Sequence, residues 1–238
     1  MSDQIEIGFL SPVASDSPHF KDFVASIPEG INLSVEGLGL VRQSLLDLDG
    51  ASDHIFRESI RAVSSHPEWQ SIALLGAPVE IGSPGVAERI ESSVEIPLTT
   101  AMRASAEAAR AMNVAKVLLL TPFDDVLNSK IRERLALLGL DAVSPDSPFR
   151  SYRDAQGYGP DDVINFANQS LIENRDVEAI YFQGAVLDPI RVMDRMETQF
   201  HVPVIASNIA MLWHASSLVG GRFPFPGYGQ LAEEWPAL

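Results

Sequence analysis

The chain has 238 residues, of which 46% are hydrophobic and 21% charged, so it has enough apolar side chains for a sizeable core. Its formal net charge is −15 at pH 7, and such an acidic surface repels phosphate backbones and anionic lipids, which argues against nucleic acid and membrane partners. There is no cysteine, which excludes disulfides, thiolate metal sites and cysteine nucleophiles.

The start of the chain has no basic region followed by an apolar run, and no stretch has the roughly 18 uncharged apolar residues of a membrane span. We therefore expect a cytoplasmic protein. The five histidines show neither the HxH nor the HExxH spacing typical of zinc sites, so no metal or other cofactor is expected.

Short apolar runs alternate with helical patterns along the chain. The runs predict strands at Ile5–Leu10, Asn32–Leu38, Ser71–Leu75, Lys116–Thr121, Asp141–Ser144, Ala179–Phe182 and Pro203–Ala206. The periodic segments predict helices at Asp53–Ser64, Val86–Ser93, Ala101–Met112, Asp124–Leu138, Pro160–Asn174, Pro189–Gln199 and Asn208–Val219.

This alternation predicts an α/β fold with parallel sheets and right-handed crossovers. Because the pattern runs twice, we expect two pseudo-symmetric, Rossmann-like lobes with an active-site cleft between them. One lobe is predicted to contain residues 1–112 together with 208–238, and the other residues 113–207.

Ligands of parallel α/β sheets bind beyond the carboxyl ends of the strands. Five loops occupy that position: Ser11–Pro18, Gly76–Gly85, Thr121–Asp125, Gln183–Pro189 and Ser207–Asn208. If the two lobes face each other, these loops surround a single cleft.

The loop Gly76–Gly85 is the most informative, because its glycines permit a tight path and its N–H groups can receive a carboxylate. It matches neither GxGxxG nor a P-loop, so a nucleotide site is unsupported. Glu80 is a candidate general base, although loop glutamates are more often simply exposed. Asp188 is a second candidate, but it precedes Pro189 and is also typical of a helix cap.

Five ordered stretches resemble a known family. They are Gly8–Pro12, Leu75–Ala77, Thr121–Phe123 with Asn128, Pro203–Asn208 with Trp213, and Gly227–Leu231. Together they resemble the arylmalonate decarboxylase and maleate isomerase branch of the Asp/Glu racemase superfamily, over nearly the whole chain.

The resemblance implies cofactor-free carbanion chemistry, which members of the family perform with one or two thiols. The second thiol position falls at Gly184 and the first at Gly76 or Ala77, so both thiols are absent. The family's Thr-Ser pair falls at Ala77 and Pro78, and its tyrosine at Phe123. An asparagine of the isomerases falls near Ser15.

These observations predict a cofactor-free lyase or isomerase that acts on a small organic carboxylate without a thiol, with Glu80 and Asp188 as the catalytic candidates. The predicted substrate-binding residues are Ser11, Pro12, Ser15, Gly76, Ala77, Pro78, Thr121, Phe123, Gln183, Gly184 and Ala185. The alternative is an inactive relative that binds a small carboxylate or a protein partner. A nucleotide-binding protein is the least supported hypothesis, and a homo-oligomer stays open.

Overall fold

The computed structural model describes residues 4–15, 17, 20–40 and 50–238. Its strands form two four-stranded sheets, in which every pairing is parallel. The first sheet has the order β2-β1-β3-β4 and the second β6-β5-β7-β8. The strands are β1 (Ile5–Ser11), β2 (Ile31–Gly37), β3 (Ser71–Leu74), β4 (Leu98–Thr100), β5 (Lys116–Leu120), β6 (Asp141–Val143), β7 (Ala179–Phe182) and β8 (Val204–Ala206).

Helices connect the strands. The α-helices are α1 (Lys21–Ala25), α2 (Ser52–Ser65), α3 (Ala77–Gly82), α4 (Val86–Glu91), α5 (Ala101–Ala111), α6 (Asp125–Leu137), α7 (Pro160–Glu173), α8 (Met193–Phe200), α9 (Ser207–Leu218) and α10 (Gln230–Glu234). The described residues also include the 3-10 helices η2 (Tyr152–Gly157) and η3 (Ile190–Val192). In the described part of the chain no helix is both long and apolar enough to cross a lipid bilayer.

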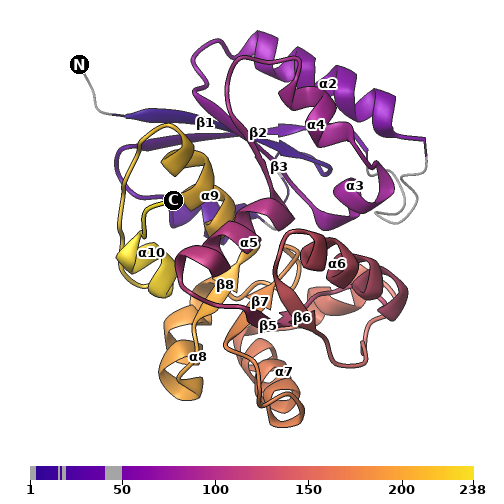
Figure 1. Cartoon of the computed structure of the whole chain (residues 1–238), viewed down its shortest axis with the longest axis vertical. Coiled ribbons are helices and arrows are strands. Elements are labelled where there is room, and N and C mark those ends of the chain that lie inside the picture. The colour runs from indigo at the N-terminus through magenta and orange to yellow at the C-terminus, as the bar shows by residue number, and fades with distance from the viewer. Residues whose placement is uncertain (1–3, 16, 18–19, 41–49) are drawn as a thin grey trace.

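The two-lobed α/β fold predicted from the sequence is confirmed, and Figure 1 shows one sheet above the other with α5 and α9 between them. Continuous apolar runs such as Val117–Leu120 are fully buried, as expected for parallel strands covered on both faces. The exact division of the chain at residues 112 and 208 stays a prediction.

Helix α9 joins the last strand of the second sheet to the first lobe, where it contacts α5, β1, β3 and β4. The facing helix α5 is rich in buried alanines, and these small side chains allow the two helices to approach closely. One hydrophobic core runs through both lobes and includes Phe9, Ala104, Leu119 and Trp213. A smaller core lies between the first sheet and the helices α2 and α4. The two lobes are therefore joined by a common hydrophobic core.

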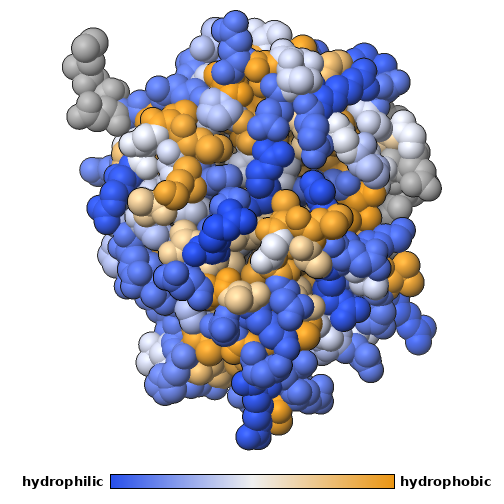
Figure 2. Space-filling model, viewed as in Figure 1, coloured by the Kyte–Doolittle hydropathy of each residue, from blue (hydrophilic) through white to orange (hydrophobic). Residues whose placement is uncertain are grey.

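The predicted loop at Gly76–Gly85 is in fact mostly helical, because α3 occupies Ala77–Gly82, and α4 begins directly after the loop. Pro78 is at the second position of α3, where the missing N–H of proline costs no hydrogen bond. The strand β4 contains two threonines in place of an apolar run and leads directly into α5, so it was missed in the sequence. On the outside, Figure 2 shows hydrophilic side chains over most of the viewed face, with hydrophobic ones gathered across its middle.

Candidate active site

A cavity of about 250 Å³ lies where the carboxyl ends of the strands from both sheets meet. Eight of the residues predicted from the sequence line it. The first lobe contributes Ser11, Pro12, Gly76 and Pro78, and the second contributes Phe123, Gln183, Gly184 and Ala185. Residues from four of the five predicted loops thus meet at this cavity, and the fifth, Ser207–Asn208, reaches it as well.

Three predicted substrate-binding residues do not line this cavity. The hydroxyl of Thr121 contacts Asn128 and accepts a hydrogen bond of 3.0 Å from the backbone N–H of Phe123, so it shapes the loop after β5. Ala77 is fully buried as the first residue of α3, and Ser15 is exposed. The structure therefore places these three outside the cavity, because their local folding directs them elsewhere.

Glu80 lies in α3 and lines a separate cavity. Its carboxylate accepts a hydrogen bond of 3.1 Å from the backbone N–H of Met102 and another from the hydroxyl of Thr100, so it contacts the N-terminus of α5. Burial raises the pKa of Glu80 to about 7, although these two hydrogen bonds favour the ionised form. Glu80 therefore has a structural role at the start of α5, and it does not line the main cavity.

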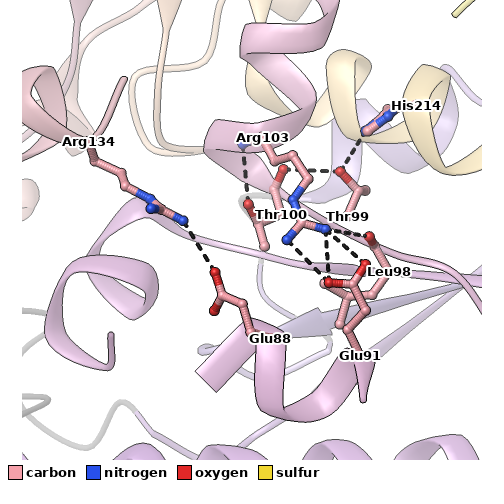
Figure 3. Close-up of polar contacts among 8 residues, drawn as sticks. All are labelled: Glu88, Glu91, Leu98, Thr99, Thr100, Arg103, Arg134 and His214. Carbon is pink, nitrogen blue, oxygen red and sulfur yellow. Dashed lines mark hydrogen bonds and ion pairs between the residues drawn. The ribbon is translucent and has the colours of Figure 1, made fainter. Parts of the chain in front are cut away.

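Polar contacts around β4 continue this network. The side chain of Thr100 caps α5 by accepting a hydrogen bond of 3.2 Å from the N–H of Arg103. Figure 3 shows that Arg103 also pairs with Glu91, and that Thr99 contacts the ring of His214. Burial lowers the pKa of His214 to about 4, so this histidine is neutral at pH 7 and does not line the main cavity.

Asp188 lies in a recess of about 10 Å³ beside the main cavity. Gly184, Ala185, Ser207 and Asn208 line both the recess and the cavity, so the two spaces share a wall. One carboxylate oxygen of Asp188 accepts a hydrogen bond of 3.0 Å from the N–H of Ile190, which fixes the side chain at the start of η3. Burial is the main cause that raises the pKa of Asp188 to about 6.

Gln183 follows β7 and contributes a buried amide to the cavity wall. Its side-chain oxygen accepts a hydrogen bond from the hydroxyl of Tyr181, which is completely buried. Burial raises the pKa of Tyr181, so the phenol stays protonated and serves as a donor. With its oxygen engaged in this way, the amide NH₂ group of Gln183 is available to a ligand.

The backbone is unusual at Gly184, which the resemblance places at the family's second thiol position, and at Gly76, which with Ala77 is one of the two candidates for the first. Gly184 has φ = +111°, and a Cβ atom there would lie 3.1 Å from Cδ of Pro122. Gly76 has φ = +93°, but a Cβ atom would come no closer than 3.5 Å to Pro12. Side chains are thus disfavoured at both positions by the backbone, and at Gly184 by space as well.

Several residues of the cavity wall were missed in the sequence analysis. Ser207 and Asn208 were recognised only as part of a loop at a strand end, although that position was itself a signal. Tyr152 comes from η2, in the long connection between β6 and α7, and no sequence pattern indicated it. Among the described residues that line the cavity, none is a lysine, arginine or histidine.

A model of the arylmalonate decarboxylase family matches residues 25–232. The chain belongs to the arylmalonate decarboxylase family. No curated protein sequence matches it.

Solved structures of this kind have the same fold. A crystal structure of arylmalonate decarboxylase has a TM-score of 0.77 at 20% sequence identity, over 96% of this chain and 99% of that one. The maleate isomerase Iso of Pseudomonas putida S16 has a TM-score of 0.77 at 16% identity, over 97% of this chain and 99% of that one. A cysteine-to-serine mutant of a Nocardia farcinica maleate cis-trans isomerase, with a covalently bound succinylcysteine intermediate, has a TM-score of 0.75 at 17% identity, over 97% of this chain and 98% of that one.

The family model confirms the family that the sequence resembles, and the solved structures confirm the fold. They also make the departure of this chain concrete, because a relative forms an intermediate on cysteine and this chain has no cysteine at all. Among the described residues, no group of three or more histidine, aspartate or glutamate side chains is placed to hold a metal ion.

Proposed function

We propose that the protein is a cofactor-free lyase or isomerase of the decarboxylase and maleate-isomerase kind, which acts on a small organic carboxylate with a carboxyl group in place of a thiol. Membership of the arylmalonate decarboxylase family supports the reaction class. The observation that carries the proposal is Asp188, whose pKa is raised to about 6 in a recess that shares its wall with the cavity.

Asp188 is the residue that we assign to proton transfer. In a decarboxylation, the bond between the substrate carbon and its carboxylate breaks, CO₂ leaves, and the electron pair remains on an enolate. Protonated Asp188 then delivers its proton to that carbon and becomes ionised, and a proton from solvent restores it. A catalytic acid works best when its pKa lies near the working pH, and a pKa of about 6 satisfies this condition.

The proton has a short path to travel. Asp188 does not line the main cavity, but the recess beside it has about the volume that one water molecule needs. A single bridging water is a common route for general acid catalysis. The glycine backbone at Gly184 leaves this wall free of a side chain.

Donors for the developing enolate come from neutral groups. The NH₂ group of Gln183 and the hydroxyl of Ser11 belong to the cavity wall. Donors that are fixed before the reaction stabilise developing negative charge without having to reorient. Glu80, the other catalytic candidate from the sequence, has its carboxylate at the start of α5 and has no part in this scheme.

The test is turnover by the purified protein with a panel of malonates, arylmalonates and maleate, followed by NMR detection of products. The proposal expects a monocarboxylate or a trans isomer from at least one substrate. It expects Asp188→Asn, which keeps the shape of the side chain, to lose activity about 10²-fold or more while remaining folded. If wild type and variant show equal rates, Asp188 is not the acid. If wild type shows no turnover while it binds these carboxylates, the inactive alternative is correct.

A further inference from the structure

Helix α9 begins at the cavity, and no side chain caps its N-terminus. Ala206 occupies the N-cap position and has no polar side chain to accept a hydrogen bond. By contrast, α5 and α6 are capped by Thr100 and Asp124. The first N–H groups of a helix have no partner within the helix, and together they carry the positive end of its dipole. Helix α9 has 12 residues, so this end attracts an anion.

The first two side chains of α9 are an independent sign of a ligand. Ser207 and Asn208 are only 5% and 8% exposed, and both line the cavity. In the part of the chain that the structure describes, neither side chain has a hydrogen-bond partner. Their polar atoms are not sealed inside the protein, so they are available to form hydrogen bonds with a ligand in the cavity.

The rest of the wall sets the chemistry of that ligand. Phe20, Phe123 and Met211 give the cavity a largely apolar lining, which suits an aromatic or branched aliphatic group. The described lining contains no cationic side chain, so an anionic group has to be held by N–H and O–H donors, and Ser207 and Asn208 supply such donors at the start of α9. Asp188 borders the same recess.

We infer that the N-terminus of α9, with the side chains of Ser207 and Asn208, binds the carboxylate of an aryl- or alkyl-substituted acid whose apolar part fills the cavity. This inference rests on the proposed function and extends it, because it places one substrate carboxylate beside the recess of Asp188. The bound carboxylate is then close to the residue that we assign to proton transfer.

The test uses the full-length protein and phenylacetate, a stable aryl carboxylate, with binding measured by isothermal titration calorimetry. Ser207→Asp places a permanent carboxylate at the first position of α9, where it satisfies the helix end and competes with the ligand. We expect phenylacetate binding to weaken at least about 10-fold, because charge-assisted hydrogen bonds are lost. Asn208→Leu, which removes the donor and adds no charge, is expected to weaken binding as well.

Ser52→Asp is the matched control. Ser52 is the first residue of α2, whose N-cap residue Ala51 also lacks a side-chain cap, and Ser52 does not line the cavity. The variant adds the same charge at an equivalent helix position, so its phenylacetate affinity is expected to equal that of wild type. Circular dichroism of all variants establishes that they are folded.

Binding and turnover separate the two proposals. If Ser207→Asp and Asn208→Leu both bind phenylacetate as wild type does, or if wild type does not bind it, the carboxylate site at α9 is wrong even when turnover is observed. If binding is lost in these variants but no carboxylate in the panel is turned over, the site stands and the proposed reaction fails.

Discussion

Arg191 binds Asp22 through two hydrogen bonds of 2.6 Å each, which join η3 of the second lobe to α1 of the first. Both members of the pair influence the pKa of Asp188, in opposite directions. The negative charge of Asp22 raises the pKa of Asp188, and the positive charge of Arg191 lowers it. The ion pair that connects the lobes therefore also helps to set the proton affinity of the residue that we assign to proton transfer.

Substitutions of this pair are expected to move the titration of Asp188 in opposite directions. Arg191→Met removes the cation, so the pKa of Asp188 should rise. Asp22→Asn removes the anion and frees the charge of Arg191, so the pKa should fall. NMR titration of the Asp188 carboxyl carbon measures both shifts, and shifts of equal sign would show that the two charges do not act on Asp188 as the structure indicates.

The glycine at the second thiol position is expected to resist any side chain. Gly184→Ala combines a left-handed backbone with a Cβ atom 3.1 Å from Pro122. Gly139→Ala is the control, because Gly139 has φ = +84° and open space around it. We expect the control to cost about 1–2 kcal/mol of unfolding free energy and Gly184→Ala to cost about 1–3 kcal/mol more. Equal losses in urea unfolding would mean that the contact with Pro122 relaxes freely.

The hydroxyl of Tyr181 is expected to position Gln183. Tyr181→Phe keeps the ring and removes the donor, so the amide oxygen of Gln183 loses its partner. The side-chain amide of Gln183 is then free to rotate. We expect a loss of about 1–3 kcal/mol in stability together with weaker binding of phenylacetate. Tyr228→Phe is the control, because Tyr228 is partly exposed and does not line the cavity. Unchanged affinity in Tyr181→Phe would leave the hydroxyl with a purely structural role.

Two buried groups are expected to give opposite contributions to the pH dependence of stability. His214 has a pKa of about 4 in the folded protein, below its ordinary 6.5, so the unfolded chain binds more protons and stability falls as pH drops from 6.5 to 4. The full difference corresponds to roughly 3 kcal/mol. Glu80 has a raised pKa of about 7, so the folded protein binds more protons than the unfolded chain between pH 4.5 and 7. The stability that protonated Glu80 contributes is therefore lost as pH rises through this range.

The variant Glu80→Gln tests this account. Because the glutamine does not titrate, its stability relative to wild type should increase with pH between 4.5 and 7, whatever the cost of the changed hydrogen bonds. Urea unfolding at several pH values measures the difference, in which the other titrating groups cancel. A difference that does not vary with pH would show that Glu80 titrates normally in the folded protein.

The fold could be predicted from the sequence because its strands are apolar runs that alternate with periodic helices, as Val117–Leu120 illustrates. The cavity could be placed because parallel strands bring their carboxyl ends together, and Ser11, Gly76 and Gln183 follow from that rule. Residues near the strand ends were therefore predictable even without knowledge of the chemistry.

What the sequence could not provide depends on contacts between distant segments. Glu80 was a plausible base until the structure placed its carboxylate on the N–H of Met102. Thr121 was a plausible ligand until its hydroxyl was found at Asn128. The strand β4 contains two threonines and runs directly into α5, so no apolar run marks it. Tyr152 reaches the cavity from a connection without a periodic pattern.

The pH dependence of turnover is the most direct test of the central claim that Asp188 replaces a thiol as the proton donor. With a substrate found in the panel, kcat/KM of wild type should fall as pH rises through about 6, because the donor must be protonated and burial sets its pKa there. Asp188→Asn should have little activity and no such titration. A wild-type profile that is flat from pH 5 to 8, or a variant with the same profile as wild type, would contradict the account.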